Sequence, residues 1–499
     1  MKLKTRSLYM IKNIFGYNAV KSLTMLISMV CVFILALLEH RKEFFCIKLL
    51  PLSFLIVLCL FNYRKSVKGL GSFIVYWAYF FRFTVFPVLI VLGDYRADVS
   101  VDIYGPYFNK ACIVMIIELV VVFCALSYFA NKSLKKIKKQ KKLNANCDMT
   151  VSNTKLINRI DNLCSSSIIR LILAICLAYV LFVCLLYPGL IKLYWRVLFI
   201  SDRSGNNNML LSQYISTIPG YIYYVFKFCA ELTRYLIAAV FVAQVNKNKD
   251  NALMSWTLTI IITVCSVAIL TSEQINSVII GVAIAYYMLL KYKESDRIIV
   301  VFGLFILIVM AVLFFIKIAD VSDLGSLGRI MNNYFNGPIS TAIALYTKNN
   351  VANFGTTPIR DIVGSIPFVG RIVDYNTLNE VYRASNNIHT AIMPMAGYGY
   401  CYFGYLGCWL PALLVVWTVD FFDELTMKRV GDGLRILLYV CIIHLALSVF
   451  MYNVCIYYNT WIYIYAPILL MTLFAKQFRG NYKIRTKNGL KLANSASII

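Results

Sequence analysis

The stretch from residue 320 to residue 393 carries five basic side chains whose types could act on an anion. Its basic residues are Arg329, Lys348, Arg360, Arg371 and Arg383. Arginine outnumbers lysine here, and a planar guanidinium group binds phosphate or carboxylate through paired hydrogen bonds. The set as a whole predicts recognition of an anionic substrate. For any single arginine, an ion pair with a nearby carboxylate or a lipid phosphate is an equally good explanation.

One of only three histidines, His389, follows these arginines and precedes an apolar run that begins at residue 395. A neutral imidazole accepts a proton from a hydroxyl near neutral pH and also donates hydrogen bonds to phosphate. A structural role, in which the imidazole orients the start of the next helix, has equal weight. The sequence therefore offers His389 both as a candidate base and as a helix-capping residue.

Membrane helices must position these residues. Of the 499 residues 60% are hydrophobic and 14% are charged, and the mean hydropathy is +0.72, which excludes an ordinary soluble domain. Apolar runs of about 17 to 25 residues suffice to cross a bilayer. We count twelve, approximately at 22–38, 45–61, 70–93, 109–130, 167–187, 217–245, 254–271, 275–290, 298–319, 395–421, 434–451 and 457–474. The expected fold is an all-α, polytopic membrane protein.

Charge predicts the orientation of these helices. If the N-terminus is cytoplasmic, 31 of the 49 Lys and Arg residues lie in the cytoplasmic segments, as the positive-inside rule requires. The net charge of +26 then reflects topology and attraction to membrane lipids, so nucleic acid is not an expected partner. The expected segments are helices 1–4 in 1–130, a basic cytoplasmic linker in 131–166, helices 5–9 in 167–319 with a smaller outward loop at 188–216, a large outward loop in 320–393, helices 10–12 in 394–474, and a basic cytoplasmic tail in 475–499.

The cysteine pattern suggests no metal site. Most of the fifteen cysteines lie inside apolar runs, and the sequence contains neither a CxxC motif nor a Cys/His cluster. We expect these cysteines to be small core residues, and we expect no metal and no cofactor.

The large outward loop is expected to form short amphipathic helices at the membrane surface, because glycine and proline interrupt it repeatedly. Thr377 and Glu380 have the spacing of a capping box, which predicts a short helix beginning there. In the smaller outward loop, Arg203 lies in a polar run that follows Pro188 and Gly189.

Charged residues also occur inside the expected spans. Arg82 and Glu118 lie near mid-depth of the third and fourth spans, and Lys227, Glu231 and Arg234 recur on one face of the sixth. Such groups normally face a cavity or one another. A structural pair of Arg82 with Glu118 is as good an explanation as a role of Arg82 in guiding a charged headgroup.

This pattern resembles the Wzy-type O-antigen polymerases of bacterial envelopes, which join oligosaccharide repeat units. The resemblance rests on about a dozen helices, a large arginine-bearing loop in the C-terminal half, a smaller loop near the middle, and two short motifs, Asn387-Ile388-His389-Thr390 and Tyr402-Phe403-Gly404-Tyr405-Leu406-Gly407. The related O-antigen ligases place a histidine closer to such a GxxG motif, which favours polymerase over ligase. The family's spacing of an arginine, ten residues and a glycine is not found after Arg360, Arg371 or Arg383.

The resemblance implies transfer of a glycan from undecaprenyl diphosphate to a hydroxyl of a second lipid-linked repeat unit, at the periplasmic face of the bacterial inner membrane. It implies that membrane lipids and a chain-length regulator are partners. Arg360, Arg371 or Arg383 would stabilise the leaving diphosphate without a metal. His389, Asp374 or Glu380 would be the base, and Arg203, Arg329 and Arg82 would bind substrate.

Two other classes remain open at this point. A flippase for lipid-linked oligosaccharide explains the charges within the membrane but not the long outward loop. A sugar or ion transporter would show internal repeats or paired broken helices, and neither is visible in the sequence.

Overall fold

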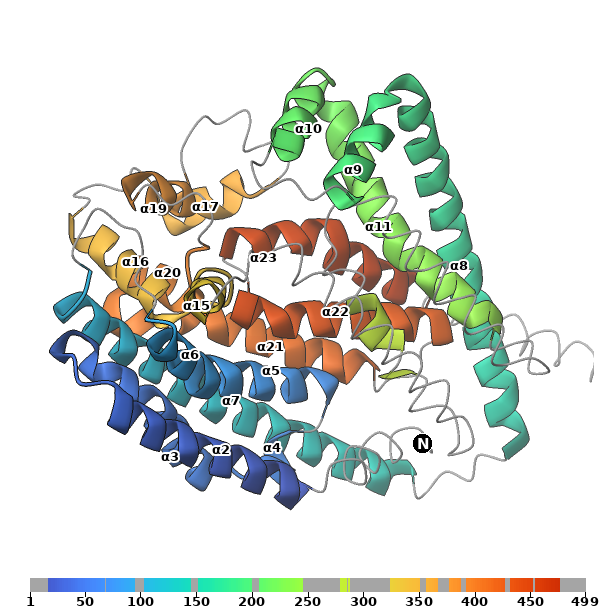
Figure 1. The fold of residues 1–499 in the computed structure, drawn as a ribbon. Coiled ribbons are helices and arrows are strands. Elements are labelled where there is room, and N and C mark those ends of the chain that lie inside the picture. Colours follow the sequence, from blue (N-terminus) through green and yellow to red (C-terminus); the bar gives the residue numbers. More distant parts are fainter. Residues whose placement is uncertain are drawn as a thin grey trace, which may run out of the picture. The chain divides into compact units, whose positions relative to one another are not determined.

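The computed structural model is built from helices, and its described part contains no strand (Figure 1). The structure describes residues 17–67, 69–94, 103–144, 151–199, 206–245, 279–284, 286–287, 324–350, 356–366, 377–386, 392–426, 431–451 and 454–475. The chain divides into two compact units. Unit 1 comprises Met1–Lys142, Phe315–Glu424 and Ile442–Thr460, and unit 2 comprises Leu143–Phe314, Leu425–Cys441 and Trp461–Ile499.

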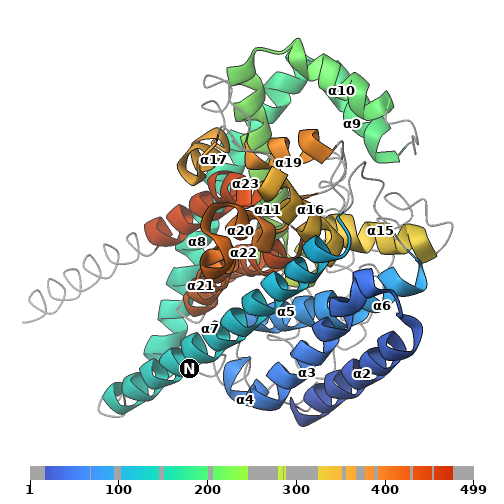
Figure 2. The same cartoon turned by 90° about the vertical axis from the view of Figure 1, so that its left-hand side faces the viewer.

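Unit 1 contains the N-terminal helices and the helices that follow residue 320. Its elements are α2 (Tyr17–Leu38), η1 (Lys42–Lys48), α3 (Leu49–Leu60), α4 (Tyr63–Ser66), α5 (Leu70–Phe80), η2 (Phe81–Val85), α6 (Phe86–Leu92), α7 (Pro106–Asn144), α15 (Leu324–Tyr334), α16 (Pro338–Asn350), α17 (Pro358–Gly364), α19 (Leu378–Asn386), α20 (Met395–Gly407), α21 (Leu410–Thr426), the end of α22 (Asp432–Met451) and α23 (Val454–Thr460). Figure 2 shows the same elements from a second direction.

Unit 2 contains α8 (Val151–Leu186), α9 (Gly189–Phe199), α10 (Asn206–Ser216), α11 (Gly220–Val245), the start of α22 and η5 (Trp461–Tyr465). In α11, Glu231 and Arg234 are buried and form an ion pair, and the Lys227 ammonium lies 5.6 Å from the centre of the Tyr463 ring. Two of the three charged groups expected on one face of the sixth span therefore face each other, and the third faces an aromatic ring.

Seven helical stretches among the described residues are long and apolar enough to cross a membrane. They are Asn18–Leu38, Lys42–Leu60, Leu70–Leu92, Pro106–Lys132, Ser167–Leu186, Asp432–Val449 and Val454–Ala475, and each coincides with one of the twelve expected spans. The expected span 217–245 coincides with α11. The expected spans 254–271 and 298–319 and half of the residues of 275–290 lie outside the described residues.

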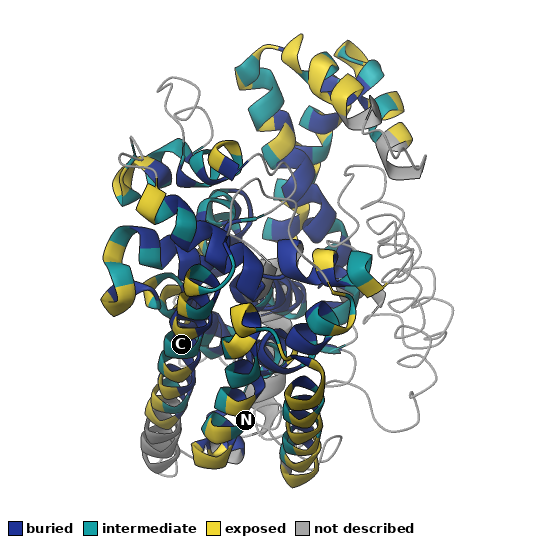
Figure 3. Cartoon of the chain, turned by 60° about the vertical axis from the view of Figure 1, so that its left-hand side comes forward, coloured by how far each residue is buried: buried dark blue, intermediate teal, exposed yellow. Residues whose placement is uncertain are grey.

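Exposed residues run along these helices (Figure 3), and many of them are large and apolar. On α2 they include Leu23, Leu26, Phe33 and Leu37, and on α8 they include Leu171, Ile175, Leu181 and Leu185. Water would disfavour so much exposed apolar surface, whereas lipid tails accommodate it. The pattern supports a membrane-spanning protein.

The tenth expected span, 395–421, is not one straight helix. Its two halves, Met395–Gly407 and Leu410–Thr426, meet at 101°. Gly404 has φ 64° and ψ −159°, a conformation essentially restricted to glycine. A Cβ atom added to Gly399 would lie 2.4 Å from the Cys408 carbonyl oxygen, so this glycine permits the close return of the chain. The glycines of the GYGYCYFGYLG stretch therefore form a bend.

Helices α15 and α16 form a helical hairpin, and its first arm packs along α6. The hairpin begins at the end of α6, where a Cβ on Gly93 would lie 2.3 Å from the Leu324 carbonyl oxygen. Its turn reaches Arg82, whose Nε donates to the Asn336 carbonyl oxygen at 2.9 Å. The eleven residues from Arg82 to Gly93 correspond to about 16 Å of helix. The turn therefore lies near the middle of the Leu70–Leu92 stretch.

The return helix α16 leads back toward the start of α7, where the Tyr346 and Tyr107 rings lie 5.4 Å apart. Its own first turn is capped from within the hairpin, because the Asn332 side-chain oxygen accepts from the backbone N–H groups of Ile339 and Ser340 at 3.0 and 3.1 Å. This cap satisfies helix-terminal donors that would otherwise be unpaired inside the protein. The polar turn is thereby stable among apolar helices.

Candidate functional site

A buried carboxylate, Asp361, joins the helices that follow residue 355. Asp361 is fully buried at the start of α17. It accepts hydrogen bonds from the hydroxyl groups of Tyr398 at 2.8 Å, Tyr402 at 2.6 Å and Thr356 at 2.8 Å, and from the backbone N–H of Leu378 at 2.9 Å. One carboxylate thus ties α17, the start of α19 and the first two turns of α20 together, and we call this group of five residues the Asp361 anchor.

The expected short helix at residue 377 is present, and its capping box is confirmed. The Glu380 carboxylate accepts from the Thr377 backbone N–H at 2.6 Å and from its hydroxyl at 2.9 Å, while the Glu380 N–H donates back to the Thr377 hydroxyl at 3.4 Å. In this cap, one carboxylate oxygen of Glu380 accepts two hydrogen bonds, both from Thr377. Any role of Glu380 as a base would compete with this cap.

Helix α19 packs along α16 through buried polar contacts. The Asn386 amide donates to the Thr347 hydroxyl at 2.8 Å, and the Tyr382 hydroxyl donates to the Ser340 carbonyl at 3.3 Å. Next to these contacts, the Lys348 ammonium donates to the Cys401 carbonyl oxygen of α20. Helices α17 and α19 therefore form a folded cluster with α16 and α20.

The structure places three of the loop arginines on this cluster. Arg360 is exposed on α17, Arg383 is half-buried in the last turn of α19, and Arg329 is exposed on α15. The Asp361 anchor holds the helices of Arg360 and Arg383 together, while Arg329 belongs to the hairpin. His389, Arg371, Asp374 and Arg203 lie outside the described residues.

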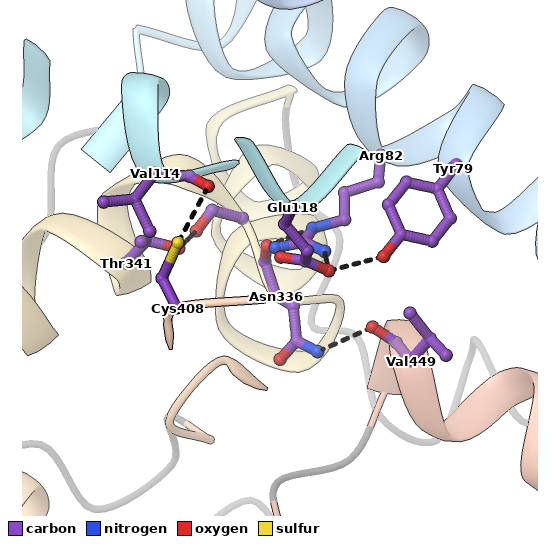
Figure 4. Close-up of polar contacts among 9 residues, drawn as sticks. Tyr79, Arg82, Val114, Glu118, Asn336, Thr341, Cys408 and Val449 are labelled. Carbon is purple, nitrogen blue, oxygen red and sulfur yellow. Dashed lines mark hydrogen bonds and ion pairs between the residues drawn. The ribbon is translucent and has the colours of Figure 1, made fainter. Parts of the chain in front are cut away.

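Arg82 pairs with Glu118, which was one of the two explanations left open for Arg82 by the sequence (Figure 4). The Arg82 Nη1 donates to Glu118 Oε1 at 2.8 Å, and the Tyr79 hydroxyl donates to the same oxygen at 2.5 Å. The guanidinium group also lies 5.9 Å and 5.7 Å from the ring centres of Tyr79 and Phe83. With exposed side-chain fractions of 1% for Arg82 and 0% for Glu118, this pair has no direct access to a bulky headgroup.

A second charged cluster joins the end of α2 to the end of α6. Arg41 donates to both carboxylate oxygens of Glu39 and also pairs with Asp94. Burial raises the pKa of the Glu39 carboxyl, but the hydrogen bonds and charge of Arg41 outweigh burial and the pKa lies below its usual value. The same ion pair raises the pKa of Arg41.

Sequence reasoning did not single out the Asp361 anchor or Asn336. Two signals were present: Asp361 follows Thr357 and Pro358 at the start of a helix, and Tyr398 and Tyr402 are four residues apart on one helix face. The contact of Asn336 with Arg82 joins residues 254 positions apart. Local pattern carries no information about such a contact.

Among the described residues no cluster of His, Cys, Asp and Glu side chains has the arrangement of a metal site. Comparison of the chain with protein-family models, with curated proteins and with solved structures finds no significant match.

Proposed function

We propose that this chain is a polysaccharide polymerase of the inner bacterial membrane, which joins polyprenyl-diphosphate-linked oligosaccharide repeat units at the periplasmic face. The donor is a glycan on undecaprenyl diphosphate, and the acceptor is a hydroxyl of a second lipid-linked unit. The C1–O bond to the diphosphate breaks, a new glycosidic bond forms, and a base takes the proton of the hydroxyl. The proposal rests on the arginine chemistry and on the family resemblance described above.

The structural observation that supports the proposal is the Asp361 anchor, which fixes two short arginine-bearing helices on the first two turns of α20. A leaving diphosphate develops negative charge, and guanidinium groups on rigid helices stabilise that charge better than groups on a mobile loop. Arg360 and Arg383 are the described candidates for this role, and Arg371 is the third. His389 and Asp374 are the proposed bases, since the cap engages the Glu380 carboxylate.

The test is chain formation by the purified protein in nanodiscs, supplied with a polyprenyl-diphosphate-linked repeat unit. Arg360→Ala and Arg383→Ala should each lower the rate of transfer roughly a hundredfold, the usual effect of removing a group that stabilises transition-state charge. Lys110→Ala is the matched control, because Lys110 is an exposed cation near the start of α7 and belongs to neither helix. Full-length chains from both arginine variants would refute the proposal. Transfer to a lipid-A-type acceptor in place of a second repeat unit would indicate a ligase.

One structural observation favours a second candidate, a transporter or flippase of lipid-linked oligosaccharide. The bent pair α20–α21 and the hairpin α15–α16 give the discontinuous helices that the sequence did not reveal, and transporters bind substrates at such breaks. A proteoliposome assay separates the two functions. Movement of a fluorescent lipid-linked oligosaccharide between leaflets without any change in glycan length would favour the transporter.

A further inference from the structure

The turn of the α15–α16 hairpin meets a cluster of buried polar atoms that the described residues leave without hydrogen-bond partners. These atoms are Arg82 Nη2, Glu118 Oε2 and Asn336 Oδ1. The three residues have exposed fractions of 1%, 0% and 0%. An unsatisfied buried polar group destabilises the folded state, and more so if it is charged. Two of these atoms, Arg82 Nη2 and Glu118 Oε2, belong to groups that are hydrogen-bonded to each other, so they call for a molecule that satisfies both.

The geometry of the ion pair explains why two of these atoms are open. The guanidinium and carboxylate groups meet through a single hydrogen bond, from Nη1 to Oε1, and not through the two parallel bonds of a bidentate pair. The Tyr79 hydroxyl also donates to Oε1, so Oε2 receives nothing. One donor and one acceptor on neighbouring groups thus remain available to the same small molecule (Figure 4).

Asn336 contacts the ion pair from the hairpin turn through its backbone, and its side chain points away toward α22 (Figure 4). Its backbone oxygen accepts from Arg82 Nε, and its side-chain N–H donates to the Val449 carbonyl of α22 at 3.2 Å, which leaves its side-chain oxygen as an acceptor. Asn336 has φ 54°, an uncommon backbone conformation for a residue other than glycine. Arg82 itself lies in the π-helical turn η2, a distortion that is frequent at functional sites.

Charge and hydrogen-bonding capacity define the ligand. Arg82 and Glu118 together carry no net charge. The guanidinium group repels a cation and the carboxylate repels an anion, so a charged ligand gains no net attraction at this pair. A neutral molecule that both donates and accepts hydrogen bonds matches the open carboxylate oxygen and the open N–H. We propose that the Arg82–Glu118–Asn336 cluster is a buried water site, in which at least one water molecule donates to Glu118 Oε2 and accepts from Arg82 Nη2. Buried waters typically make about three such bonds. This proposal is independent of the proposed function.

The experiment is radiolytic hydroxyl labelling of the full-length protein in nanodiscs, read by mass spectrometry, because internal water produces radicals beside the residues it touches. Tyr79 contacts the cluster and is 1% exposed. Tyr76 is the matched control: it lies on the same helix, is 0% exposed, and has its hydroxyl paired with Thr24 at 2.6 Å. Several-fold faster labelling of Tyr79 than of Tyr76 is the expected result. Equal rates in the wild-type protein would overturn the proposal.

A double variant, Arg82→Met with Glu118→Met, adds a second readout. It keeps the side-chain volumes while removing both open polar atoms and leaving no unpaired charge. Labelling of Tyr79 should fall to the rate of Tyr76 in this variant. If the variant folds and Tyr79 is still labelled as fast as in the wild-type protein, the water does not bind at this pair. If the variant does not fold, the comparison within the wild-type protein decides.

Discussion

Replacement of Asp361 by alanine should detach α17 and α19 from α20 without unfolding the membrane helices. A hydrogen bond to a charged group contributes about 1.5–3 kcal/mol. Of the four bonds to Asp361, those from Thr356 and Tyr402 come from half-buried residues, and water can replace the carboxylate there. The donors from buried residues, the Tyr398 hydroxyl and the Leu378 N–H, are left with no acceptor. Two such losses amount to roughly 3–6 kcal/mol.

The measurement is hydrogen exchange of the full-length protein in nanodiscs, followed by mass spectrometry. A loss of that size predicts that amide exchange in α17 and α19 accelerates roughly a hundredfold or more, since each 1.4 kcal/mol is about tenfold, while the helices of α5 to α7 stay protected. Thr356→Val is the control, because it removes one partly exposed donor and keeps the carboxylate with its other three. Unchanged protection of α17 and α19 in Asp361→Ala would show that the carboxylate does not hold this cluster.

Three further substitutions test the packing and the charged groups. Gly404→Ala should lower the thermal midpoint by an amount equivalent to about 1–3 kcal/mol, because only glycine adopts this φ/ψ pair without strain; an unchanged midpoint would contradict the bend. Arg82→Met alone should destabilise the protein by roughly 3–5 kcal/mol in denaturant unfolding, and adding Glu118→Met should restore most of that loss; equal losses in both would contradict the pairing argument. The folded-state pKa of Glu39 is lowered, so the ionised Glu39 carboxylate stabilises the folded protein. This stabilisation is complete above the unfolded carboxyl pKa of about 4.3 and is lost as pH falls through the lower folded-state pKa. Glu39→Gln should therefore reduce the loss of thermal stability in acid, and an identical acid profile would contradict this assignment.

Patterns that depend on neighbours in sequence were predicted well. Apolar runs of sufficient length located seven helical stretches, because hydropathy over about twenty residues is a direct measure of fit to a bilayer. The cap formed by Thr377 and Glu380 was predicted for the same reason, since three-residue spacing alone places the two groups in contact. Opposite charges at similar depth indicated the pair of Arg82 with Glu118 as one of two explanations, and the structure contains that pair.

Features that depend on distant contacts were not predicted. The run 395–421 is apolar throughout, and its hydropathy shows neither the kink at Gly404 nor the 101° bend between α20 and α21. The hairpin α15–α16 contains too many polar residues to be recognised as lying among spans. Its asparagines are tolerated there because Asn332 caps α16 and Asn336 meets Arg82. The role of Asp361 likewise depends on two tyrosines that follow it by 37 and 41 positions.

The hairpin α15–α16 also constrains how the protein is assembled. Asn332, Asn333, Asn336 and Ser340 are buried in it, and a translocation channel would not release such a polar segment into lipid as an independent span. The partners that satisfy it, Arg82 and its neighbours on the third and fourth spans, are synthesised more than two hundred residues earlier. Membrane insertion must therefore be sequential. The N-terminal helices insert into the bilayer first, and the hairpin packs against them afterwards.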